Sequence, residues 1–262
     1  MSFNIQFDGI IFDWAGTTVD YGCFAPVQAF MDAFAEYGIT PTVDEVRGPM
    51  GMLKRDHVRT MLQMERISAE WEKVHGRAFT EDDVEQVYLL SEKKILENVA
   101  KFTDVKPYVL ETVKTLREMG LKIGSTTGYT DEMMEIVVPE AEAKGYKADC
   151  WFSPDSVGHK GRPYPYMVFK NMETLGLSDV RRVMKVGDTV SDIKEGKNAG
   201  VYTVGVIEGS SVMGLSEEEY AALGDNEKTK LCEKVGKEFM DAGADAVVLD
   251  IRGVLNLVRG NE

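Results

Sequence analysis

Short apolar runs alternate with helical patterns along most of this chain. Runs rich in Ile, Val and Phe, typical of buried strands, occur at residues 9–12, 121–126, 183–186, 201–206 and 246–249. Helical patterns followed by glycine occur at residues 107–119, 131–144 and 165–175. Strands that alternate with helices are typical of a parallel sheet with helices on both faces. The pattern therefore predicts an α/β fold with a doubly wound, Rossmann-like parallel sheet.

The strand signals disappear between residue 21 and about residue 103, where apolar positions follow a helical spacing. Two capping-box patterns begin there, at Thr42 and Thr80, and indicate helix starts. We therefore predict an all-α cap domain of four or five helices, inserted after the first strand. The predicted domains are a helical cap, residues 21–103, and a core, residues 1–20 and 104–262.

The charge of the chain limits its partners. Among 262 residues, 30 are basic and 44 are acidic, which gives a formal net charge of −14. Nucleic acids and anionic membranes bind basic surfaces, so we expect neither as a main partner. A small anionic substrate is compatible with this charge, because one metal ion and a few basic side chains reverse the potential locally.

The cysteines and the N-terminus indicate where the protein works. Cys23, Cys150 and Cys232 are far apart and odd in number, so they match neither a disulfide framework nor a zinc site. The N-terminus lacks the pattern of a signal peptide, and no segment approaches the ~18 apolar residues that a membrane span needs. We therefore expect a cytoplasmic protein without a membrane span.

Acidic residues follow two of the predicted strands. Asp13 ends the first strand, and Asp188 follows the strand at 183–186, with Asp192 four residues later. Because the carboxyl ends of parallel strands form the ligand-binding edge of an open sheet, these carboxylates are expected to converge on a hard cation such as Mg²⁺. If a helix begins at Asp188, the side chains of Asp188 and Asp192 lie one turn apart on the same helical face. Taken alone, Asp13 is more simply read as a turn or helix-capping residue.

Polar and basic residues add to this pattern. Residues 125–128, Ser-Thr-Thr-Gly, end another strand and suit the binding of phosphate oxygens. Lys160 and Arg162 stand just before the helix at 165–175, and by spacing alone either one can bind a phosphate. Each run taken singly is weak, since Ser-Thr-Thr-Gly is usually a polar turn. Their order along the chain, together with the acids, indicates one site for a metal ion and a phosphoryl group.

These motifs together resemble the haloacid dehalogenase superfamily. They are Asp13-Trp14-Ala15-Gly16-Thr17-Thr18, Thr127, Arg162 and Gly187-Asp188-x-x-x-Asp192. Most phosphatases of that superfamily carry a second acid two residues after the first aspartate, and here that position is Ala15. Longer segments are similar to the phosphonoacetaldehyde hydrolase (phosphonatase) family, and they lie at residues 12–22, 49–59, 124–130 and 161–165. The resemblance covers nearly the whole chain, including the cap.

This resemblance implies a hydrolase that cleaves the carbon–phosphorus bond of phosphonoacetaldehyde to acetaldehyde and phosphate, in the degradation of 2-aminoethylphosphonate. It implies Asp13 as the nucleophile, which becomes an aspartyl phosphate, and Lys54 as an amine that forms an imine with the substrate. The implied ligands of Mg²⁺ are the side chains of Asp13 and Asp188 and the backbone carbonyl of Ala15. Asp192 is expected to orient metal-bound water. The residues implied to hold the phosphoryl oxygens are Thr127, Gly128 and Arg162.

Ala15 and Lys54 fit together chemically. In a phosphatase, the acid at the position of Ala15 protonates a departing alkoxide. Cleavage of a carbon–phosphorus bond instead leaves a carbanion, and an imine on a lysine accepts those electrons. Lys54 must be neutral to attack an aldehyde, so burial and a nearby cation are expected to lower its pKa from ~10.4. His57, three residues later, is expected either to relay the proton or to serve as a packing partner.

Other residues of the pattern leave alternatives open. Cys23 and Tyr129 lie beside the predicted site, and we expect them to line it rather than to react.

The resemblance also implies a homodimer joined through the caps. The apolar stripe that includes Phe30 and Phe34 fits either such a contact or internal packing.

Two other functions compete with the phosphonatase hypothesis. One is a sugar-phosphate phosphatase or phosphomutase of the same superfamily, and Ala15 argues against it because an oxygen leaving group would lack its acid. The other is a non-catalytic module that binds phosphorylated ligands or a protein partner. The retention of Asp13 with Asp188 argues against that module, because binding alone does not require a nucleophile and a metal site together. Outside this context, Lys54 would be a solvated surface charge.

Overall fold

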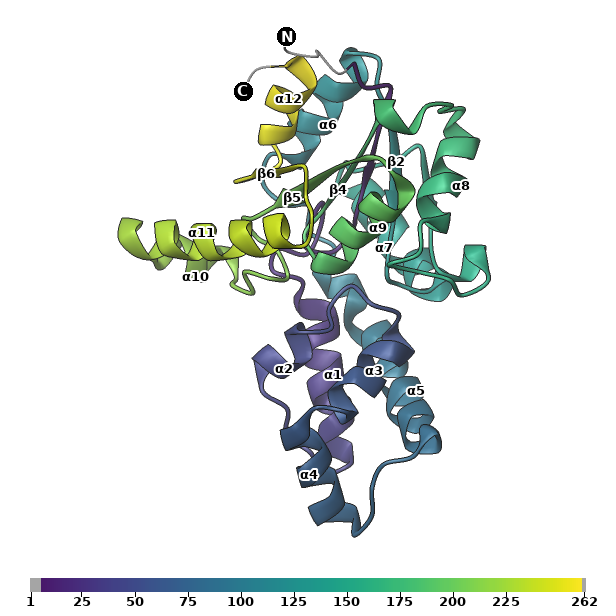
Figure 1. The fold of residues 1–262 in the computed structure, drawn as a ribbon, viewed down its shortest axis with the longest axis vertical. Coiled ribbons are helices and arrows are strands. Elements are labelled where there is room, and N and C mark those ends of the chain that lie inside the picture. The colour runs from purple at the N-terminus through teal and green to yellow at the C-terminus, as the bar shows by residue number, and fades with distance from the viewer. Residues whose placement is uncertain (1–5, 261–262) are drawn as a thin grey trace.

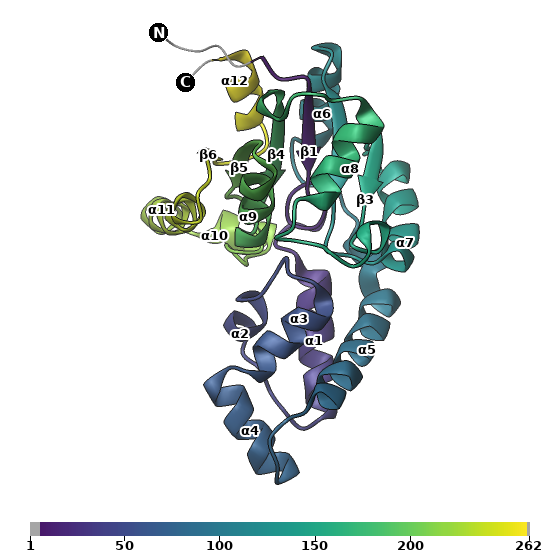
Figure 2. The ribbon, with the colours of Figure 1, turned by 45° about the vertical axis from the view of Figure 1, so that its right-hand side comes forward.

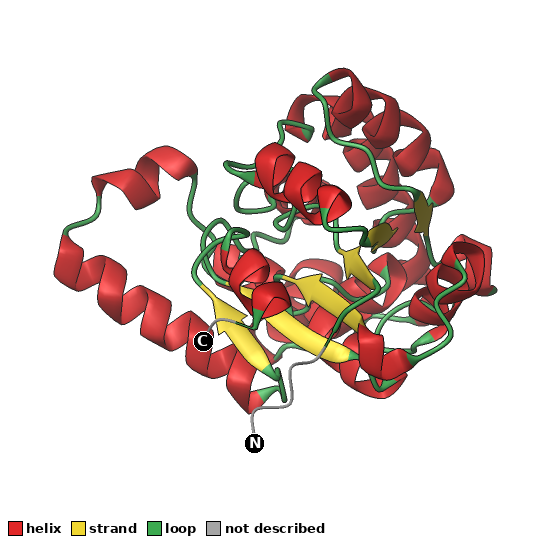
Figure 3. Cartoon of the chain, turned by 90° about the horizontal axis from the view of Figure 1, so that it is seen from above, coloured by secondary structure: helices red, strands yellow, loops and turns green. Residues whose placement is uncertain are grey.

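Six strands form one parallel sheet, in the order β3-β2-β1-β4-β5-β6, in a computed structural model that describes residues 6–260. The strands are β1 (Gly9–Phe12), β2 (Lys122–Thr126), β3 (Cys150–Phe152), β4 (Val183–Gly187), β5 (Tyr202–Val206) and β6 (Ala246–Val248). Helices lie on both faces of this sheet (Figure 3). The doubly wound α/β fold predicted from the sequence is confirmed.

The helices of the core domain divide between the two faces of the sheet. They are α6 (Val109–Glu118), α7 (Asp131–Ala143), α8 (Tyr166–Leu175), α9 (Val190–Ala199), α10 (Glu217–Ala222), α11 (Asp225–Asp241) and α12 (Gly253–Arg259). Apolar side chains of α6, α7 and α12 pack on one face of the sheet. Those of α8, α9 and α11 pack on the other. Because β4 and β1 lie at the centre, their side chains are buried from both sides.

Five helices follow β1 in the segment where the sequence predicts a cap. They are α1 (Phe24–Glu36), α2 (Val43–Arg47), α3 (Lys54–Leu62), α4 (Glu65–His75) and α5 (Glu81–Asn98). Both predicted capping boxes are present, at Thr42 and at Thr80. The five helices lie beyond the carboxyl ends of the strands and have an apolar core of their own (Figures 1 and 2). The domain bounds remain a prediction, and residues 1–5 and 261–262 of the predicted core lie outside the described residues.

The apolar stripe of α1 faces the inside of the cap. Phe30 and Phe34 are fully buried, and they pack with the fully buried Trp71 of α4. Of the two readings of this stripe, internal packing is the one that the structure shows. Burying a Phe side chain stabilises a fold by about 1.5–3 kcal/mol, so these residues hold the cap helices together.

Some elements were not predicted from the sequence. Strand β3 has only three residues, all half-buried at the sheet edge, so it leaves no long apolar run. Helix α11 is mostly charged and buries only Val235 and Phe239. The helix after β4 begins at Val190, so Asp188 precedes it and does not share a helical face with Asp192. Within residues 6–260, no helix is long and apolar enough to cross a membrane.

Candidate active site

The first strand delivers Asp13 to the sheet edge that faces the cap. Asp13 directly follows β1, and its backbone N–H donates to the carbonyl of Val186 in the neighbouring strand (2.9 Å). The chain then turns at Gly16, which has a φ of +87°. A Cβ on Gly16 would lie 2.2 Å from Oδ2 of Asp188. Glycine is therefore required here, both for the turn and for the close approach of that carboxylate.

Three carboxylates converge at this edge. One oxygen each from Asp13, Asp188 and Asp192 lie within 4.8 Å of one another, and all three residues are buried. Asp188 reaches this place from the loop between β4 and α9, where Thr189 caps the helix with its side chain. The convergence expected from the strand ends is thus present, although the single helical face is not.

The surroundings of this cluster suit a hard cation. Oδ1 of Asp188 accepts from the hydroxyl of Thr17 (2.7 Å), and Oδ2 accepts from the N–H of Ser211 (2.7 Å). Each oxygen keeps a second lone pair for a metal ion. Ala15 lines a cavity beside Asp13, and its carbonyl accepts no hydrogen bond from any residue in 6–260. The oxygen donors that the sequence implies for Mg²⁺ are therefore at hand.

The number of buried charges also indicates a cation site. A fourth buried acid, Glu195, joins the cluster. Arg162 pairs with Asp13, with Asp192 (3.1 Å) and with Glu195 (3.1 Å), and Lys185 pairs with Asp192 (2.7 Å) and Glu195 (3.4 Å). Together with Asp188, four carboxylates lie against two cations within ion-pair distance, and the charge of the buried Lys106 acts on Asp188 from farther away. The cluster keeps an excess of negative charge, which a divalent cation would offset.

The pKa values follow from this crowding. Burial, and then the charges of Asp13 and Asp192, raise the pKa of Asp188 to about 7. Burial also acts to raise the pKa of Asp192, but Arg162 and Lys185 outweigh it and hold that pKa below its usual range. The charge of Lys106 lowers the pKa of Asp188 only in part, so this is the carboxylate whose ionisation a metal ion would favour.

The side chains of the segment predicted to hold phosphate have two different roles. Thr127, Gly128 and Arg162 line the cavity beside Asp13. The hydroxyl of Thr126 instead accepts from Arg162 (2.9 Å) and donates to Glu195, which fixes the guanidinium.

Lys160 is outside this cavity. Its side chain is exposed, and its Nζ lies 5.6 Å from the centroid of the Tyr166 ring. Of the two basic residues that spacing alone could not separate, Arg162 is therefore the one beside Asp13.

Lys54 extends into the same cavity from the cap. It is the first residue of α3 and is only 7% exposed. Its Nζ lies 5.2 Å from the ring centroid of Tyr129 and 5.8 Å from that of Phe30. Burial lowers the pKa of this amine, and the charge of Arg162 lowers it further, while Cys23 and Asp13 act to raise it. The net direction favours the neutral amine that attack on an aldehyde needs.

The cavity is small and is lined by residues of both domains. Its volume is about 20 Å³. Cys23 and Met50 complete its wall on the cap side, and Tyr129 does so from the core. Burial raises the pKa values of Cys23 and Tyr129, so both stay protonated and line the cavity as the sequence suggests.

His57 lies in the cap core and does not line this cavity. Its ring is fully buried and stacks on Phe30, with 4.0 Å between the ring centroids. Neither ring nitrogen has a hydrogen-bond partner within residues 6–260. Burial, and then the charge of Lys54 one turn away, hold the pKa of His57 well below its usual value. The structure therefore places a neutral imidazole next to the Lys54 amine.

Sequence reasoning missed several residues of the site. Lys185 lies in a predicted strand, and the sequence pattern gives no signal at Glu195, yet both are fully buried in the charge cluster. Lys106, in the second linker to the cap, is also buried and donates to the carbonyls of Gly16 and Glu208 (2.8 Å to the latter). A lysine inside a strand that is otherwise fully buried is the one signal that could have found Lys185, because such a charge needs a partner.

Comparison with known proteins agrees with this geometry. A model of the haloacid dehalogenase-like hydrolase family matches residues 7–200. The phosphonoacetaldehyde hydrolase of Lysinibacillus sphaericus (strain C3-41) is 54% identical over 240 residues, which span 92% of this chain and 89% of that protein. That of Bacillus cereus (strain AH187) is 47% identical over 254 residues, which span 97% of this chain and 96% of that protein.

A solved structure is similar over the same length. The crystal structure of a phosphonoacetaldehyde hydrolase-like protein from Oleispira antarctica matches with a TM-score of 0.92 at 34% identity, covering 98% of this chain and 96% of that one. Similarity of this extent includes the cap as well as the sheet. The chain therefore belongs to the haloacid dehalogenase-like hydrolases and, among these enzymes, to the phosphonoacetaldehyde hydrolase family.

Proposed function

We propose that this enzyme hydrolyses the carbon–phosphorus bond of phosphonoacetaldehyde through an imine on Lys54 and an aspartyl phosphate on Asp13. One observation carries this proposal: Lys54 of the cap and Asp13, which follows β1, line the same cavity. Position 15, where an acid would serve an oxygen leaving group, is an alanine in the same wall. The names of the relatives support the same substrate.

The first half of the reaction belongs to Lys54. Its neutral amine attacks the aldehyde carbon, and water leaves as the imine forms. Protonation of the imine nitrogen prepares it to accept an electron pair. Tyr129 and Phe30 around the amine exclude bulk water, so that the condensation is favoured over hydration of the aldehyde.

The second half belongs to Asp13. Its carboxylate attacks phosphorus, and the electrons of the carbon–phosphorus bond move to the iminium nitrogen, which leaves an enamine on Lys54 and an aspartyl phosphate. Protonation at carbon and hydrolysis of the imine release acetaldehyde, and water hydrolyses the aspartyl phosphate. One water is released and two are consumed, so the net reaction uses one. Arg162, which already contacts Asp13, is placed to hold the phosphoryl oxygens with its planar guanidinium.

We further propose Mg²⁺ as the metal, held by Asp13, Asp188 and the Ala15 carbonyl. When bound, the ion would offset negative charge on the phosphoryl oxygens. Each oxygen of Asp192, unlike those of Asp188, already faces two protein donors. Oδ1 lies 2.7 Å from Lys185 and 3.1 Å from Arg162, and Oδ2 accepts from the hydroxyl (2.6 Å) and the N–H (3.2 Å) of Thr189. This supports an indirect role for Asp192, orienting groups around the ion rather than binding it.

A coupled assay tests the proposed reaction. Phosphonoacetaldehyde and Mg²⁺ are supplied, and acetaldehyde is followed with alcohol dehydrogenase and NADH. We expect Lys54→Arg to keep the fold and lose nearly all activity, because a guanidinium cannot form the imine. Lys160→Arg, outside the cavity, is the matched control and should retain wild-type rates. An active Lys54→Arg variant would exclude the imine.

The same assay separates the alternatives. Release of p-nitrophenol from p-nitrophenyl phosphate, without acetaldehyde from phosphonoacetaldehyde, would favour a phosphatase. Inactivity toward both would favour a non-catalytic binding module. Borohydride added with substrate should trap the imine and label Lys54. Below the lowered pKa of this amine the protonated form predominates, so trapping should fall as the pH decreases.

We also propose the cellular setting implied by the family: a cytoplasmic homodimer in the degradation of 2-aminoethylphosphonate. The three cysteines are free in the structure, in keeping with a reducing compartment. Because Phe30 and Phe34 are buried within one cap, a dimer would need other cap residues. Light scattering after size exclusion tests the dimer, and a monomer at micromolar concentration would contradict it.

A further inference from the structure

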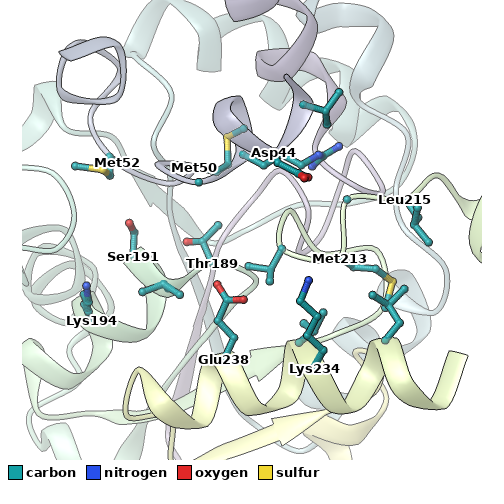
Figure 4. A pocket seen from close by; sticks show the side chains of 18 residues that line it. Asp44, Met50, Met52, Thr189, Ser191, Lys194, Met213, Leu215, Lys234 and Glu238 are labelled. Atoms are coloured by element: carbon teal, nitrogen blue, oxygen red, sulfur yellow. The ribbon is translucent and has the colours of Figure 1, made fainter. Parts of the chain in front are cut away.

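A groove of about 440 Å³ separates the cap from the core on the side of α11. Asp44, Met50 and Met52 of the cap form one wall, and core residues that include Thr189 and Lys234 form the other (Figure 4). Within residues 6–260, hydrogen bonds that cross this groove from one domain to the other are few. Arg47, at the end of α2, makes such a contact.

Arg47 links the cap to a core loop and to the first linker. Its Nη1 donates to the carbonyl of Ser211 (3.0 Å) and to that of Gly22 (2.8 Å). Within the described part of the chain, the bond to Ser211 is the only hydrogen bond or ion pair between residues 24–98 and residues 104–260. The guanidinium also lies 5.0 Å from the ring centroid of Phe24.

The core loop is shaped to receive this side chain. Gly214 has a φ of +71°, and a Cβ there would lie 2.9 Å from Nε of Arg47. The linker contacts the same loop, because the N–H of Gly22 donates to the carbonyl of Gly209 (2.8 Å). Three separate segments therefore meet where Arg47 binds.

The loop continues to the metal site. The Ser211 residue whose carbonyl receives Arg47 donates its own N–H to Oδ2 of Asp188 (2.7 Å). One residue thus contacts the cap on its carbonyl side and the carboxylate cluster on its amide side. Its position depends on both.

We propose that Arg47 is a positioning residue that couples the seating of the cap to the metal-holding geometry of Asp188. With the cap seated, Arg47 fixes the Ser211 carbonyl, and the loop in turn holds the Ser211 N–H on Asp188. Arg47 touches neither substrate nor metal, and its effect passes through the loop. Its consequence for catalysis rests on the proposed function, but its consequence for metal binding does not.

Mn²⁺ binding without substrate is the decisive measurement, followed by calorimetry or electron paramagnetic resonance. Losing a partner that orients a metal ligand typically costs about 10–100-fold in metal affinity. We expect Arg47→Met to weaken Mn²⁺ about 10-fold and to lower kcat for phosphonoacetaldehyde with a smaller change in KM. Arg47→Lys, which can reach one carbonyl, should recover part of the affinity. Lys234→Met, which removes a charge from the same groove, should change neither quantity.

A Mn²⁺ affinity of Arg47→Met within twofold of wild type would overturn the proposal, even if kcat falls. Near-UV circular dichroism verifies the fold. If Arg47→Met does not fold, Arg47→Gln is measured in its place, with the order Arg, Lys, Gln expected for affinity and any other order refuting the coupling. Failure of wild type to release acetaldehyde would reject the proposed function and leave the Mn²⁺ comparison still valid.

Discussion

Lys185 occupies the centre of the buried charge cluster, and its replacement by methionine tests whether that cluster is balanced as described. Its Nζ lies 2.7 Å from Asp192 Oδ1, 3.4 Å from Glu195 Oε2 and 3.0 Å from Thr126 Oγ1, and the side chain is fully buried. Methionine keeps much of the volume and removes the charge. Four carboxylates would then face Arg162 alone.

The expected cost follows from this burial. Removing one partner of a buried ion pair costs about 3–5 kcal/mol, because the remaining charge stays desolvated. At about 2–4 °C per kcal/mol for a domain of this size, Tm should fall by roughly 6–20 °C. Lys197→Met is the matched control: its pair with Asp245 (2.6 Å) has both side chains about one-third exposed, so it should cost less than about 1 kcal/mol.

Urea denaturation with EDTA measures the free energy of unfolding without a metal contribution. The double variant Lys185→Met/Glu195→Gln should recover part of the loss, since it also removes one of the excess negative charges. The reasoning is refuted if Lys185→Met costs no more than Lys197→Met. It is also refuted if the double variant is no more stable than the single one.

Two other expectations concern the metal and the first linker. Mg²⁺ at about 100 times its Kd should stabilise the fold by about 2.7 kcal/mol, so its removal with EDTA should lower Tm. EDTA should also abolish activity. An EDTA-treated enzyme with unchanged activity and Tm would contradict the metal site. Burial raises the pKa of Asp20 from 3.8 to about 6. The folded chain therefore binds this proton more tightly than the unfolded chain, and the contribution of Asp20 to stability falls as the pH rises through this range. Relative to Asp20→Asn, wild type should therefore be about 1 kcal/mol more favoured at pH 5 than at pH 7, and equal differences at both pH values would argue against the shift.

Much of the fold followed from periodicity, since β1, β2, β4, β5 and β6 are short apolar runs with helical patterns around them. The helix α11 was harder to recognise, because its buried Val235 and Phe239 stand among many charges. Strand β3 depends on its neighbour, as it pairs only with β2 in the described sheet and has no periodicity of its own.

The residues of the site also differ in how far the sequence alone identifies them. Asp13 and Asp188 follow strands, so topology alone brings them together. Lys185 and Ser211 could not be assigned from sequence: the first looks like a break in an apolar run, and the second acts through its backbone amide, which any residue except proline supplies. Such roles depend on tertiary contacts rather than on residue type.

The cavity between Lys54 and Asp13 is small, at about 20 Å³, and it lies between the cap and the core. If phosphonoacetaldehyde is the substrate, we expect the two domains to move apart for its entry and together again for the chemical steps. Entry of substrate and escape of product then happen in one phase, and bond making and breaking in another. The proposed enamine would then be confined to the closed state, and we expect solvent viscosity to slow the first phase without changing the second.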